Sequence, residues 1–190
     1  MLKIFILIVL ASMVSQPVFA FSFGAGTGSC CVVDANYASL GSAMSNRTKN
    51  FHSGPYSLTS NMSVYLPNTP VEIMIAGPAF TGILFAVVDE MGNNVGTFAP
   101  EENIVQECDD LNPDTPPGEV VSHMSLFGDL TTYTLFWLPP VMDVGTVHVI
   151  GYILKGNRGN IVDQEFYRFA KGEASSLTIN SDVIFENSFE

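Results

Sequence analysis

The sequence has 190 residues, and its 7 Lys and Arg residues against 19 Asp and Glu residues give a formal net charge of −12 at pH 7. A negative potential of this size repels phosphate backbones and anionic lipid head groups, so we do not expect nucleic acid as a partner. The length suits one domain with a well-buried core.

The first twenty residues have the layout of a secretory signal peptide. Lys3 precedes an unbroken apolar run from Ile4 to Leu10, and Val18-Phe19-Ala20 places small residues where a signal peptidase cleaves. We expect cleavage after Ala20 and a secreted or periplasmic product. An uncleaved anchor is the alternative, but the run is short for a bilayer span, and no later segment reaches transmembrane length.

Three cysteines follow the expected cleavage site: Cys30, Cys31 and Cys108. In an exported protein two of them are expected to pair, which leaves one over. A bond between the neighbouring Cys30 and Cys31 would be strained, so we favour a bridge from one of them to Cys108. Closing so long a loop would stabilise the fold by about 3–5 kcal/mol in a loop-entropy estimate.

After the expected cleavage site, the sequence at first shows no regular spacing of apolar and polar residues. Residues 21–29 are rich in Gly and Ser and predict an irregular arm, and Cys30 to Val33 could begin a strand. Residues 36–50 are polar and are interpreted as loop.

The stretch from Pro70 to Val88 is the centre of the expected fold. Its first part alternates between apolar and other residues from Val71 to Ala76, which predicts a strand with one buried face. Its second part, Ile83 to Val88, is apolar at every position, as in a strand covered on both faces. Gly77-Pro78 predicts a break between two strands, because Pro has no N–H to donate and Gly weakens a ladder.

Further short strands are separated by Gly, Pro and Asn turns at roughly ten-residue spacing. We expect them at residues 56–58, 95–98, 120–125, 131–137, 146–154 and 166–169. Residues 100–118 form the longest expected loop, which is acidic and rich in proline. No stretch has a sustained 3.6-residue apolar period, so the pattern predicts an all-β sandwich.

A series of short motifs in this chain follows the order of a known family. They are Gly54-Pro55-Tyr56, Ala76-Gly77-Pro78, Phe80 to Ala86, Val95 to Phe98, Val121-Ser122-His123, Phe136 to Pro140 and Gly145 to Val149, with Cys30 before and Cys108 among them. The series resembles the reeler domain, which begins reelin and F-spondin-like proteins. That domain also occurs in insect defence proteins and in front of ferric-chelate-reductase-like membrane proteins.

The resemblance covers residues 21–169 and implies an immunoglobulin-like antiparallel β-sandwich, export, and a disulfide from Cys30 to Cys108, with Cys31 as the alternative partner. Two features depart from the family pattern. The His-Gly after the first cysteine and the second cysteine pair are both missing. The aromatic-Trp ending that follows the last strand in the family is replaced by Gly156-Asn-Arg-Gly159 and Phe166-Tyr-Arg-Phe169. The expected organisation is a signal peptide (1–20), a reeler-like domain (21–172) and a C-terminal tail (173–190).

The end of the chain bears on its source. Asp182 to Glu190 resembles the Phe-Glu-terminated tails of some secreted gammaproteobacterial proteins, and the region after Gly156 is similar to bacterial exported relatives of the sandwich. Those relatives often carry Cys-x-x-Cys-His, a haem attachment pattern. Cys30-Cys31 lacks that spacing and a following His, so we expect no covalent haem and no other cofactor.

Two groups of residues could bind a metal ion, but each also has an ordinary structural explanation. Asp110, Asn112 and Asp114 begin a calcium-loop pattern, but Thr115 and Val121 stand where Gly and Glu would be needed, which favours a solvated acidic loop. The three histidines, His52, His123 and His148, could join in a metal site. We expect His123 and His148 to be hydrogen-bonded structural residues instead, and Trp137 to be a core anchor between the sheets.

No Gly-x-Ser-x-Gly elbow and no phosphate-binding Gly loop occurs in the sequence. The reeler resemblance therefore implies an exported, non-enzymatic module that binds an unknown protein or surface ligand. The alternative, suggested by the ferric-chelate-reductase context, is a periplasmic or extracellular accessory domain for electron transfer or metal reduction.

Overall fold

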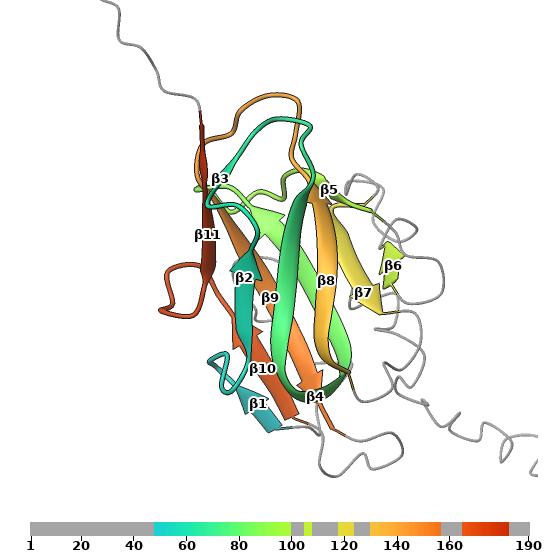
Figure 1. Cartoon of the computed structure of the whole chain (residues 1–190). Helices are drawn as coiled ribbons and strands as arrows, with labels where there is room; N and C mark the ends of the chain where they lie inside the picture. Colours follow the sequence, from blue (N-terminus) through green and yellow to red (C-terminus); the bar gives the residue numbers. More distant parts are fainter. Residues whose placement is uncertain (1–47, 100–104, 108–117, 124–129, 157–164, 183–190) are drawn as a thin grey trace, which may run out of the picture.

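The computed structural model describes residues 48–99, 105–107, 118–123, 130–156 and 165–182, and all regular structure within these ranges is strand. The strands in chain order are β1 (Thr48–Asn50), β2 (Ser57–Ser60), β3 (Val64–Tyr65), β4 (Val71–Val88), β5 (Thr97–Phe98), β6 (Val105–Glu107), β7 (Val120–His123), β8 (Leu130–Leu138), β9 (Val147–Lys155), β10 (Glu165–Phe169) and β11 (Leu177–Ser181). They form one curled sheet that folds over itself (Figure 1). The all-β prediction is confirmed.

The curled sheet makes two layers because β4 belongs to both. Its second half pairs with β9 and β7, in the order β1-β10-β9-β4-β7-β6, which we call the first layer. Its first half pairs with β2 and β8, and β8 pairs with β5, which completes the second layer. The long pairs are antiparallel as expected, whereas the short pairs β1–β10 and β3–β11 are parallel.

The predicted break at Gly77-Pro78 is wrong, because β4 runs through it as one bent strand. The register of β4 shifts between Ala76 and Phe80, and residues 77–79 have no partner in the registers of the neighbouring strands. Pro78 therefore removes no ladder hydrogen bond where the strand passes from one layer to the other. A Cβ on Gly77 would lie 2.4 Å from Cδ1 of Tyr56, so the bend also needs a residue without a side chain.

The main core lies between the two layers. Trp137 is fully buried there, its indole N–H donates to the carbonyl of Val95 at 3.0 Å, and its ring meets Tyr65 edge to face at 5.5 Å. Burial raises the pKa of Tyr65 to about 12, and its hydroxyl donates to the carbonyl of Gly145 at 2.8 Å. The prediction that Trp137 anchors the core is confirmed.

Four short strands are not expected from the sequence. β1 and β6 fall in predicted loops, β3 has two residues, and β11 lies within residues 173–190, which the sequence analysis separates as a tail. β11 pairs with β9 and β3, so the sandwich includes it. β1, β3 and β6 have only two or three residues, which is too short for a period of two to show.

Candidate interaction surface

The outer surface of the second layer carries exposed apolar side chains. On β4 and β8 the alternation turns one set of residues inward and the next outward. The outward side chains, which we call the open face, are Glu72, Met74, Thr132, Thr134, Phe136 and Leu138, flanked by Thr59 on β2 and Thr97 on β5. Met74 is 43 % exposed, Phe136 38 % and Leu138 39 %.

The strand register joins these side chains into one strip. Phe136 lies opposite Glu72, and Met74 lies opposite Thr134, so Met74 and Phe136 are diagonal neighbours, about 7–8 Å apart in such a pairing. Leu138 follows Phe136 by two positions on the same side of β8. Within this set Glu72 alone is charged, although the chain has a net charge of −12. Depletion of charge around apolar side chains is typical of the centre of a protein interface.

A charged cluster lies at the start of β9. The Nε2 atom of His148 is 2.9 Å from Oε1 of Glu90, and Nζ of Lys171 is 2.6 Å from Oε2 of the same carboxylate. The ion pair with Lys171 and the hydrogen bond with His148 hold the pKa of Glu90 below its usual range. Nδ1 of His148 also lies 3.1 Å from Oγ1 of Thr178, so both ring nitrogens are hydrogen-bonded, as expected for a structural histidine.

Beside this cluster is a cavity of about 200 Å³. Its lining consists of Val88, Gly92, Ile150, Arg168, Ala170, Lys171 and Glu173. Both cations have carboxylate partners, since Arg168 pairs with Glu173 and Lys171 with Glu90. The charges compensate one another: the Lys171–Glu90 pair joins the loop after β10 to the loop after β4, and the Arg168–Glu173 pair joins β10 to the loop that follows it.

His123 is buried where β7 meets β4. Its Nδ1 lies 3.2 Å from the backbone N and 3.1 Å from the carbonyl O of Ile83, so the ring is hydrogen-bonded to the backbone of β4. A Cβ on Gly82 would lie 2.5 Å from the ring. Burial lowers the pKa of His123, so the ring is kept neutral. The expected structural role of His123 is confirmed, and its hydrogen bonding joins β7 to the neighbouring strand β4.

The other candidate residues have different outcomes. Over the described ranges no three His, Cys, Asp or Glu side chains come together as a possible metal site, and His52, His123 and His148 lie on separate elements. The calcium candidates Asp110, Asn112 and Asp114, the three cysteines and the expected signal peptide lie outside the described residues. In the part of the chain with assigned structure, no helix could span a membrane.

The sequence matches the family model of the Reeler domain over residues 40–156, more than half of the chain. The chain belongs to the Reeler domain family. The fold agrees with this membership: the crystal structure of the Reelin-N domain of F-spondin superposes with a TM-score of 0.55 at 16 % identity, over 73 % of this chain and 94 % of that one. The human F-spondin reeler domain (fragment 1) gives a TM-score of 0.54 at 16 % identity, over 72 % and 95 %. No curated protein matches the sequence.

The open face of this reeler domain was not singled out from the sequence. The alternation on residues 71–76 and 131–137 assigns Met74 and Phe136 to the side opposite the expected core residues. That both belong to one strip depends on the register of β4 with β8, which links residues about sixty positions apart in the chain. A search for exposed Met and Phe on alternating strands would have found the residues but not that they are neighbours on the sheet.

Proposed function

We propose that this reeler protein is exported and acts as a non-enzymatic binding module, with the open face as the surface that contacts its protein or surface ligand. The observation that carries the proposal is the strip of Met74, Phe136 and Leu138, exposed on a sheet where Thr side chains surround them. Large apolar side chains that stay exposed together on a folded domain commonly mark an interaction site.

Charge gives the proposed partner a chemical character. Outside the open face the protein is strongly acidic, and it repels other acidic proteins at long range. A partner with an apolar centre and a neutral or basic rim would be attracted, and its apolar centre would cover Phe136 and Leu138. Long-range charge would then set the rate of encounter, while apolar contact on the open face would hold the complex.

Export is the second part of the proposal. It is supported by the leader-like residues 1–20, with their basic start, apolar run and small residues before Phe21. The proposed mature protein begins at Phe21. Mass measurement of the N-terminal peptide from the exported protein tests this, and a chain that retains Met1 would contradict it.

The binding role can be tested on intact cells of the source organism. Labelled full-length mature protein is compared with Phe136→Lys, which places a charge in the strip, and with Met91→Lys, which changes an exposed apolar residue in the loop after β4. We expect Phe136→Lys to lose saturable binding with an unchanged melting temperature, and Met91→Lys to bind as the natural sequence does. Unchanged binding by Phe136→Lys, or equal loss in both variants, would contradict the proposal.

A further inference from the structure

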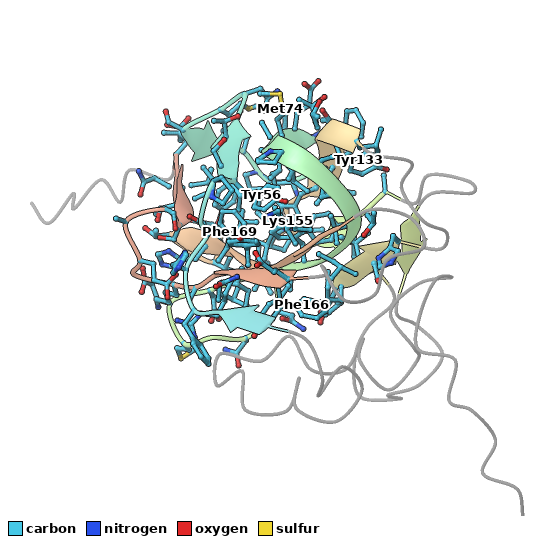
Figure 2. All side chains as sticks on the ribbon, turned by 90° about the horizontal axis from the view of Figure 1, so that it is seen from below. Tyr56, Met74, Tyr133, Lys155, Phe166 and Phe169 are labelled. Carbon is cyan, nitrogen blue, oxygen red and sulfur yellow. The ribbon has the colours of Figure 1, made fainter. Side chains whose placement is uncertain are left out.

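The outer surface of the first layer differs from the open face in being apolar and buried. Its side chains, which we call the covered face, are Leu84, Ala86, Val88, Val120, Ile150, Tyr152, Leu154 and Phe166, and they are between 0 and 8 % exposed. They alternate along β4 and β9 with residues of the main core, such as Phe85 and Ile153, and therefore point away from it. Figure 2 shows Phe166 and Met74 on opposite sides of the molecule, with the core ring of Phe169 between them.

Burial on this side requires a third layer. Every strand of the described ranges has its place in the two layers or at their edges, so none is left to cover these eight side chains. An apolar surface of this size would be costly in water, because each large apolar side chain gains about 1.5–3 kcal/mol when it is buried. The cover must come from another part of the chain or from another molecule.

One part of the chain has the length and the composition to provide it. The segment between the expected cleavage site and β1, residues 21–47, carries Asp34 and Arg47 as its charged residues and offers Val32, Val33, Tyr37, Leu40 and Met44 as apolar side chains. The connections 100–104, 124–129 and 157–164 are short. Residues 108–117 are acidic, and residues 183–190 follow β11 at the other end of the chain.

The topology also gives this segment a path. It ends just before Thr48 in β1, one edge of the first layer, and β6 is the opposite edge (Figure 1). In the sequence, Cys108 is the residue after the end of β6. Five strand spacings of about 4.8 Å separate β1 from β6, a distance near 24 Å. The chain from Cys31 to Thr48 can extend roughly 56 Å at about 3.3 Å per residue, which is ample for the crossing.

We propose that residues 21–47 cross the outside of the first layer from β6 to β1 and form the cover of the covered face. The disulfide from Cys30 or Cys31 to Cys108, which the reeler resemblance implies, would hold this segment at the β6 edge. The inner side of the layer is filled by the main core, so the outer side is the route open to a chain joined to both edges. The covered face is then internal, and the open face is the side left for a partner.

Photo-crosslinking tests the crossing directly. Benzoylphenylalanine replaces Phe166 on the covered face of the full mature chain, or Phe136 on the open face as the matched control, and tryptic peptides are mapped after irradiation. We expect Phe166→benzoylphenylalanine to join a peptide within residues 21–47, and Phe136→benzoylphenylalanine to join none there. Bonds from position 166 only to other segments, or to a second copy of the chain, would overturn the proposal.

A second experiment tests the proposal even if benzoylphenylalanine at position 166 disturbs folding. The double variant Tyr37→Asp, Leu40→Asp should release the cover and raise the binding of anilinonaphthalene sulfonate several-fold, with Trp137 emission unchanged. The control Ser42→Asp, Ser45→Asp adds the same charge to the same segment and should leave dye binding unchanged. Equal dye binding in both, or non-reducing peptide maps with Cys108 as a free thiol, would overturn the proposal.

Discussion

The two outer faces of the sandwich share one strand and differ in almost every other respect. On the first half of β4 the outward residue Met74 is 43 % exposed among Thr neighbours, whereas on the second half the outward Ala86 is fully buried among Leu84 and Ile150. One face resembles the solvated side of a two-layer sandwich. The other has the composition of a second core, and the proposed cover would add a third layer on that side.

The largest expected effect concerns the core beneath both faces. Trp137→Ala removes a fully buried ring and its 3.0 Å hydrogen bond to Val95, and it should lower the free energy of unfolding by about 3–5 kcal/mol. Urea titration measures the loss, and a variant that is not secreted would show the same defect in cells. A loss below about 1 kcal/mol, within the range usual for surface substitutions, would show that the ring does not hold the layers together.

A matched pair of leucines compares the faces themselves. Leu84 on the covered face is buried, while Leu138 on the open face is 39 % exposed. Leu84→Ala should cost about 2–5 kcal/mol of unfolding free energy, and Leu138→Ala less than about 1 kcal/mol. Chemical denaturation of both variants under the same conditions provides the comparison. Equal costs would mean that the two faces are equally exposed in solution.

The pH dependence of the unfolding free energy tests whether His123, on β7 of the first layer, is buried. Burial lowers the pKa of this ring in the folded state, so the unfolded chain, with an ordinary histidine pKa of about 6.5, binds the proton more readily. The stability that the neutral His123 ring contributes is fully present above about pH 6.5. It is lost as the pH falls from there toward the lower pKa that His123 has in the folded protein. We expect the unfolding free energy to drop between pH 7.5 and 5.5, and to drop less in His123→Gln.

The control for this pH dependence is the same titration of His52→Gln, which removes an exposed histidine before β2. That variant should keep the full acid sensitivity of the natural chain. An identical pH dependence in His123→Gln and the natural sequence would show that another group causes the loss.

The smallest effect is expected on the open face. Phe136→Thr replaces the exposed ring by the residue type that already surrounds it, and it should change the unfolding free energy by no more than about 0.5 kcal/mol. Differential scanning calorimetry can measure this. A cost comparable to that of Leu84→Ala would mean that Phe136 is part of a core and not of an interaction surface.

Much of the contrast between the faces can be predicted from the sequence. The alternation from Val71 to Ala76 predicts one buried side, and the unbroken apolar run from Ile83 to Val88 predicts burial on both, and each half of β4 follows its prediction. Local pattern succeeds here because the period of two is a direct consequence of strand geometry.

The rest depends on contacts between distant residues. Gly77-Pro78 predicts a break because proline cannot donate the backbone hydrogen bond that a paired strand residue normally makes. In the fold, residues 77–79 have no paired residue on a neighbouring strand, because β4 changes layer there. Likewise, Phe136 and Met74 join into a strip only through the register of β8 with β4. The short strands β3 and β11 form by pairing with each other and carry no local signal of their own.

Radical footprinting of the full mature chain measures the central contrast most directly, because Phe136 and Phe166 are the same residue type on the two outer faces. Hydroxyl radicals modify a ring at a rate that follows its access to water. We predict that Phe136 is modified readily and that Phe166 is modified as slowly as the core residue Phe169. Modification of Phe166 at the rate of Phe136 would contradict the account, since the first layer would then lack its cover.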